Sequence, residues 1–167
     1  ADTPGTAVNE ATTGIEVNLL TLGGKDLNAQ LGAAGGPQVA LTGVEFGLAL
    51  MSAKSDASRR WTSAQASATG VSLNGLSGVT LSGQSLAFSL NQAESANDAV
   101  VNYATGKTTL AVATGVSTNL NLSMDGAQGE LIKASGNLTV DAFGFMRLTG
   151  DLNLTKSTGS VKLADLA

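Results

Sequence analysis

The side chains best suited to bind a ligand are the consecutive residues Arg59, Arg60 and Trp61, which combine the only adjacent basic pair with the only tryptophan. An exposed indole beside two guanidinium groups can stack on a sugar or hold an anionic group, so the three residues are a candidate ligand-binding site. In the competing interpretation Trp61 anchors the core, while the arginines protect a sheet edge against aggregation. We favour this structural interpretation.

Catalytic chemistry lacks most of its usual groups. The chain has no histidine and no cysteine, which removes the commonest general base, thiolate nucleophiles and the usual ligands of transition metals. A pair of carboxylates would suffice for glycoside hydrolysis, but no acidic pair is singled out by its spacing or by aromatic residues nearby. We therefore expect that the protein is not an enzyme.

Calcium is the one metal that the sequence suggests. Asp98, Asp125 and Asp165 are candidate ligands, because carboxylate oxygens bind Ca²⁺ and extracellular β-repeats use the ion at their junctions. Their spacing matches neither an EF-hand loop nor a glycine- and aspartate-rich nonapeptide repeat. A structural Ca²⁺ site is therefore a hypothesis, and we expect no other cofactor.

The composition excludes two classes of partner. Charged residues make up 13% of the chain and the net charge is −4, whereas nucleic-acid binding needs clustered Lys and Arg. No stretch approaches the roughly 20 apolar residues of a membrane-spanning helix. We therefore expect neither a nucleic-acid partner nor a membrane span.

Alternation of apolar and polar residues predicts strands along most of the chain. Apolar residues recur at every second position from Val39 onward, and glycine-containing turns separate the runs by roughly 8–12 residues. With only four Phe, one Tyr and one Trp to fill a core, we predict an all-β fold of mostly antiparallel strands in a thin sandwich or an elongated sheet stack. A β-solenoid is the alternative, because Val71–Gly78 and the run from Val79 resemble two successive rungs.

Several local features divide the chain further. Residues 1–14 are interpreted as a linker or inter-repeat strand, and residues 15–167 as a single all-β repeat domain. The segment Gly23 to Gln38 is glycine-rich and is expected to be a loop with a short helical turn. Asp125-Gly126 predicts a tight hairpin turn, and Phe143-Gly144-Phe145 is expected to pack two rings on one face of a strand.

Two long blocks of sequence resemble a known kind of module. The first, LTGVEFGLALMSAKSDASRRWTSAQASATGVSLNGLSGVTLSGQSLAFSLNQA, runs from Leu41 to Ala93, and the second, GNLTVDAFGFMRLTGDLNLTKSTGSVKLADL, runs from Gly136 to Leu166. Both are similar to β-rich modules found in tandem in giant bacterial surface or secreted proteins, such as LEPR-XLL-containing proteins and relatives of RTX adhesins. The shared motifs are structural and name no chemistry.

The resemblance implies a location and a role. It suggests an extracellular or cell-surface bacterial protein in which the chain is a non-catalytic structural or adhesive repeat. Its partners would then be neighbouring copies of the module, joined end to end through strand edges. The alternative is a carbohydrate- or ligand-binding module that uses Arg59, Arg60 and Trp61 to hold surface glycans.

Overall fold

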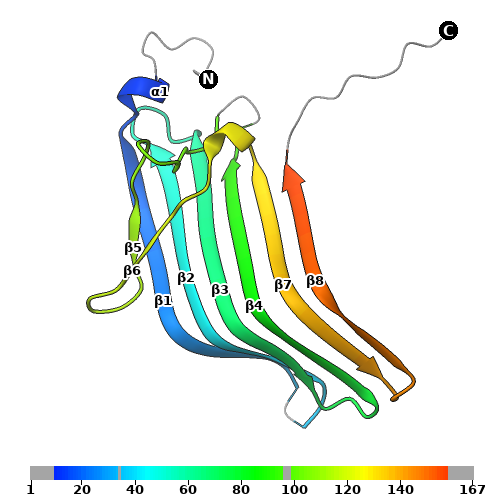
Figure 1. Cartoon of the computed structure of the whole chain (residues 1–167). Coiled ribbons are helices and arrows are strands. Elements are labelled where there is room, and N and C mark those ends of the chain that lie inside the picture. Colours follow the sequence, from blue (N-terminus) through cyan, green and yellow to red (C-terminus); the bar gives the residue numbers. More distant parts are fainter. Residues whose placement is uncertain (1–9, 34, 96–98, 158–167) are drawn as a thin grey trace, which may run out of the picture.

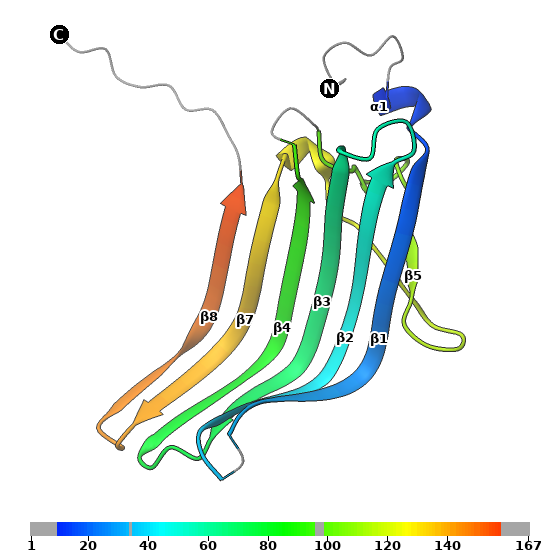
Figure 2. The same cartoon turned by 180° about the vertical axis from the view of Figure 1, so that it is seen from behind.

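The main structural element is one six-stranded antiparallel sheet (Figures 1 and 2). The computed structural model describes residues 10–33, 35–95 and 99–157. The strands lie side by side in the order β1-β2-β3-β4-β7-β8, and all neighbours are antiparallel. Their bounds are β1 Val17–Gly32, β2 Gln38–Ala53, β3 Arg60–Asn74, β4 Val79–Ala93, β7 Leu131–Ala142 and β8 Met146–Ser157. The all-β, mostly antiparallel prediction is confirmed.

The connection between β4 and β7 carries the second, much smaller layer. Residues 99–130, named the crossing segment here, contain β5 (Ala111–Ala113), β6 (Asn119–Asn121) and the 3₁₀ turn η1 (Gly126–Gln128). The segment lies over one face of β1 and β2, towards the end of the sheet where β1 begins (Figure 1). A one-turn helix, α1 (Glu10–Thr13), precedes β1 at the same end.

The core lies between the crossing segment and the sheet. Glycines at two strand positions allow the close approach: a Cβ on Gly23 would collide with the carbonyl oxygen of Ala113, and one on Gly47 would lie 2.9 Å from Leu120 Cδ2. The face of the sheet under the crossing segment is called the covered face. Its core residues and their partners from the crossing segment are Ala49, Met51, Ala53, Trp61, Ala93, Tyr103, Val112, Leu122, Met124 and Leu131.

The opposite face, called the open face, is apolar over most of the sheet and becomes polar at the end where β1 begins, with Asn18, Ser52, Thr62 and Gln92. Residues that are paired across neighbouring strands share a face, and the register gives rows that cross the strands. One row crosses all six strands and contains Leu31, Val39, Leu73, Leu81, Val140 and Leu148. Another row, nearer the start of β1, contains Leu22, Leu48, Ala64, Leu90 and Ile132. Both rows lie on the same face. β7 and β8 pair without a register shift along their whole length, so side chains in β7 alternate regularly and Ile132 of one row shares a face with Val140 of the other.

Bulges near the middle of the strands keep the open face continuous. In β4 the apolar residues are odd-numbered up to Leu81 and even-numbered from Leu86, so regular alternation would place them on opposite faces. Ser85, with φ +56°, lies at a register shift that adds one residue to β4 and restores the match with β7. Asp26 in β1 (φ +55°) and Gly43 in β2 (φ +57°) lie at the corresponding level. Figure 2 shows the strands bending in this part of the sheet.

Three local predictions were wrong. The solenoid alternative fails because the two supposed rungs lie in β3 and β4, which pair antiparallel, with Leu73 opposite Leu81. The expected loop from Gly23 to Gln38 is mostly strand, since β1 runs to Gly32. Asp125 does not make a hairpin turn; its carboxylate accepts a hydrogen bond from the Ala127 N–H at the start of η1.

The interpretation of Phe143-Gly144-Phe145 also changes. The three residues form the turn between β7 and β8 rather than part of a strand. Phe143 and Gly144 both have positive φ, and the two rings stack on each other with centroids 6.2 Å apart while both stay exposed.

None of the helices within the described ranges has the length and apolar character needed to cross a membrane.

Candidate functional site

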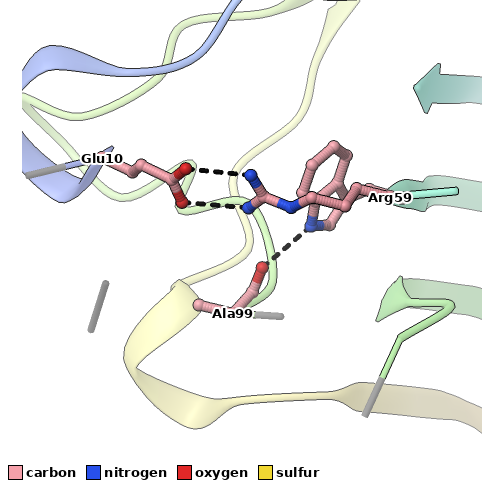
Figure 3. Close-up of polar contacts among 4 residues, drawn as sticks. Glu10, Arg59 and Ala99 are labelled. Atoms are coloured by element: carbon pink, nitrogen blue, oxygen red, sulfur yellow. Dashed lines mark hydrogen bonds and ion pairs between the residues drawn. The ribbon is translucent and has the colours of Figure 1, made fainter. Parts of the chain in front are cut away.

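Arg59 holds the start of the chain against the sheet. Its guanidinium group donates two hydrogen bonds of 2.9 Å to the two carboxylate oxygens of Glu10, a bidentate pair (Figure 3). Both side chains are largely buried, with 14% and 15% of their surface exposed. The helix α1 presents Glu10 and ends at Gly14, which has φ +72°. The cluster therefore docks α1 onto the strand end of β3.

Trp61 is part of the core. Only 4% of its surface is exposed, and its indole N–H donates a hydrogen bond of 2.9 Å to the carbonyl oxygen of Ala99. The Arg59 guanidinium carbon lies 5.3 Å from the centre of the ring, in range for a cation–π contact. This burial favours the interpretation of Trp61 as a core anchor, and a ligand-binding role for Arg59, Arg60 and Trp61 stays a prediction.

Arg60 points away from Arg59. Its side chain is exposed, donates through Nε to the carbonyl oxygen of Ala57 at 3.0 Å and lies 4.0 Å from the carboxylate of Glu94. The expected role of the two arginines in edge protection was wrong, because β3 is an inner strand between β2 and β4. The two guanidinium groups therefore do not converge on a common ligand.

A buried polar network joins the crossing segment to the sheet. The Tyr103 hydroxyl donates to Ser63 Oγ at 2.9 Å, and Ser63 Oγ donates to Asn91 Oδ1 at 3.0 Å. The Asn91 amide then donates to the carbonyl oxygen of Val101 at 2.7 Å. Burial raises the pKa of Tyr103 above its ordinary value of 10.0, so the phenol is neutral near pH 7. The network therefore joins the crossing segment to β3 and β4 through Ser63 and Asn91.

The calcium hypothesis gains no geometric support from the described residues. Asp98 and Asp165 lie outside them, and Asp125 caps η1. Within residues 10–33, 35–95 and 99–157, no three acidic side chains gather into a group that would hold a metal ion. A Ca²⁺ site stays a prediction.

The sequence and the structure were compared with known proteins. No protein-family model, curated protein or solved structure matches the chain. The function of its surfaces must therefore be inferred from the geometry of the chain itself.

The two edges of the sheet are the largest unpaired backbone surfaces. β1 is hydrogen-bonded to β2 on one side, and β8 to β7 on one side, within the described structure. Every residue of β8 is exposed. Since the sheet has an even number of antiparallel strands, β1 and β8 run in opposite directions. These edges agree with the prediction that terminal strands would be the assembly surfaces.

The open face was missed by the sequence analysis. Alternation identifies an apolar face on each strand, but it does not tell whether another element covers that face. One signal was present: the long apolar strands form one sheet, and residues 94–130 are too few to form a second layer of equal size. Counting the material for a second layer would have revealed an uncovered face.

Proposed function

We propose that the chain is a non-catalytic structural module that assembles with further copies through its sheet edges, as a repeat or subunit of an extracellular bacterial surface protein or fibre. The observation that carries the proposal is that β1 and β8, on opposite sides of one long sheet, each pair with one strand only among the described residues. An exposed edge offers unpaired N–H and C=O groups to another strand.

The even strand number makes the two edges compatible. If one copy is moved sideways without rotation, its β1 comes beside β8 of the first copy and runs antiparallel to it. The join would then continue the hydrogen-bonding pattern inside each copy. The open faces of the two copies would also lie on the same side, so the assembly would keep one apolar and one polar face.

The bulge in β1 restricts where the edges can pair. Asp26 and the register shifts on either side of Leu27 interrupt the strand, and bulges at an edge discourage pairing. The regular part of β1, Val17 to Gly24, is therefore the expected partner of the end of β8. The last residues of β8 lie at the same end of the sheet as the first residues of β1 (Figure 1).

The composition supports an extracellular structural role. The chain lacks cysteine and histidine and carries few charges. We further propose that Leu41–Ala93 and Gly136–Leu166 belong to a module that recurs in tandem in bacterial surface proteins. Neighbouring copies, linked in one chain or separate, are the proposed partners.

Disulfide cross-linking tests the edge pairing directly, because the natural chain has no cysteine. Thr21→Cys on β1 is mixed with Asn153→Cys, Thr155→Cys or Ser157→Cys on β8, which lie at or near its level across the sheet, and the products are separated without reductant. We expect at least one combination to give covalent dimers, and the matching double variant to give longer chains. Ser77→Cys, in the turn between β3 and β4, is the control for random collision.

The assembly proposal fails if all three combinations cross-link no faster than Ser77→Cys and light scattering finds only monomers. Negative-stain images of the unmodified protein provide an independent check, since edge pairing predicts ribbons that are one sheet wide.

A further inference from the structure

The open face is too large and too apolar to be ordinary surface. Leu31 is 80% exposed at one corner and Leu148 is 67% exposed at the opposite corner of the same row. Six strands of 12 to 16 residues, spaced ~4.8 Å apart with ~3.3 Å per residue, cover roughly 1,300 Å² on one face. Soluble monomers rarely expose an apolar patch above a few hundred Å².

Charged residues lie around this face rather than within it. Lys133, Asp141, Arg147 and Asp151 alternate onto the covered face. The register places two charged residues of β2, β3, β4, β7 and β8 on the open face, Arg60 and Lys156. Both lie at the end of the sheet where β1 begins. A wide apolar centre with charge at its margin is the layout of a protein interface.

On the open face, β3 carries small side chains, which form a trough, and its neighbours β2 and β4 carry larger ones, which form ridges. Ala64, Ala66 and Ala68 form the row along β3, between the larger side chains of β2 and β4, which include Phe46 and Phe88. A trough of small residues between two ridges accepts a ridge from a facing sheet, which is how the two layers of a β-sandwich interdigitate at a separation of ~10 Å.

We propose that the open face packs against the open face of a second copy, giving a two-layer sandwich with the crossing segments on its outer sides. The area agrees with this: roughly 1,300 Å² from each copy exceeds the ~800 Å² per partner of a standard stable interface.

The charged margin also predicts the relative orientation of the copies. Arg60 and Lys156 lie at the same end of the sheet, so a pair with its ends aligned would bring like charges together. A two-fold axis across the strands places these ends apart and lets the same surface serve on both copies. This pairing uses a different surface from the sheet edges and can occur with or without edge assembly.

Two neighbouring residues of β8 provide a matched test. Leu154 is exposed on the open face, and Thr155 is exposed on the opposite face of the same strand. Because Leu154→Lys buries a charge in the proposed sandwich, we expect it to weaken dimerisation by at least about tenfold in analytical ultracentrifugation, whereas Thr155→Lys leaves it unchanged. Circular dichroism and the melting temperature confirm that both variants are folded.

Spin labels on Ala66→Cys distinguish the face from the edges. Face-to-face packing predicts a distance of roughly 10–20 Å between labels on two copies, and edge pairing predicts about 29 Å, the width of six strands. The proposal is overturned by a monomeric wild type at micromolar concentration, by equal effects of the two lysine variants, or by an edge-type distance alone. A vesicle flotation assay gives a further outcome that would overturn the proposal. If the wild type floats with phosphatidylcholine vesicles and Leu154→Lys does not, the open face binds lipid.

Discussion

The Tyr103 hydroxyl donates a 2.9 Å hydrogen bond to the Ser63 hydroxyl and so ties the crossing segment to the middle of the sheet. Both side chains are buried, and Ser63 passes the connection on to Asn91 in β4. The crossing segment is thus held by specific polar contacts as well as by apolar packing, which fixes its position over the covered face.

Alkaline titration tests this network. Burial raises the pKa of Tyr103 in the folded state, so the neutral phenol is favoured there and the unfolded chain ionises first. Stability from this group is therefore present below about pH 10 and falls as the pH rises above it. We expect Tyr103→Phe to lose about 1 kcal/mol near pH 7 and to show a shallower alkaline decline in urea unfolding. Tyr103 is the only tyrosine, and a tyrosinate absorbance midpoint at or below 10 would contradict the prediction.

The Arg59–Glu10 pair should contribute to stability far more than a surface pair does. Removal of one partner of a largely buried, bidentate pair leaves the other without its counter-charge, and we expect Arg59→Ala to cost about 2–3 kcal/mol of unfolding free energy. Lys54→Ala is the control: its pair with Glu16 is 3.4 Å long and exposed, and its loss should cost less than about 0.5 kcal/mol. Equal costs in chemical denaturation would show that α1 is not docked through Arg59.

Substitution by alanine should change the stability of the protein in different directions at two glycines that lie in strands. A Cβ on Gly23 meets the backbone of Ala113 in β5, whereas one on Gly150 has open space within 4 Å. We expect Gly23→Ala to displace the crossing segment and cost about 1–3 kcal/mol. Gly150→Ala should be neutral or slightly stabilising, because alanine is less flexible in the unfolded chain. Thermal unfolding of the two variants provides the measurement, and tolerance of Gly23→Ala would contradict the close approach.

The bulge in β4 can be tested with a pair of serines. Ser85 has φ +56°, a conformation that costs a residue with a side chain roughly 1 kcal/mol relative to glycine. We therefore expect Ser85→Gly to raise the melting temperature, whereas Ser82→Gly, in the regular part of the same strand, should lower it. If both substitutions destabilise to the same extent, Ser85 does not adopt the left-handed conformation.

Much of the fold could be predicted from the period-two pattern, since β2, β3 and β4 follow it closely. The first strand was underestimated because Gly23, Gly24 and Asp26 resemble a loop. In the structure Gly23 makes room for the crossing segment and Asp26 forms a bulge. The close approach at Gly23 and the bulge at Asp26 both depend on tertiary contacts, and the local alternation of apolar and polar residues contains no information about such contacts.

The candidate site was harder to predict for the same reason. Glu10 meets Arg59 across 49 residues of sequence, and no local spacing indicates such a pair. Ser63 and Asn91 belong to the polar side of their strands and look solvent-facing, yet they are fully buried. The usual inference that the apolar side is covered fails here, because the crossing segment lies on the more polar face and leaves the aliphatic face open.

The return of the chain to one end of the sheet has a mechanical consequence. Val17 begins β1 and Ser157 ends β8 at that end, on opposite sides of the sheet (Figure 1). A pulling force applied at these two points acts across the strands and loads the hydrogen bonds of one strand pair at a time. An isolated copy would therefore unzip strand by strand at low force, and the proposed pairing with other copies predicts a higher resistance to stretching in an assembly.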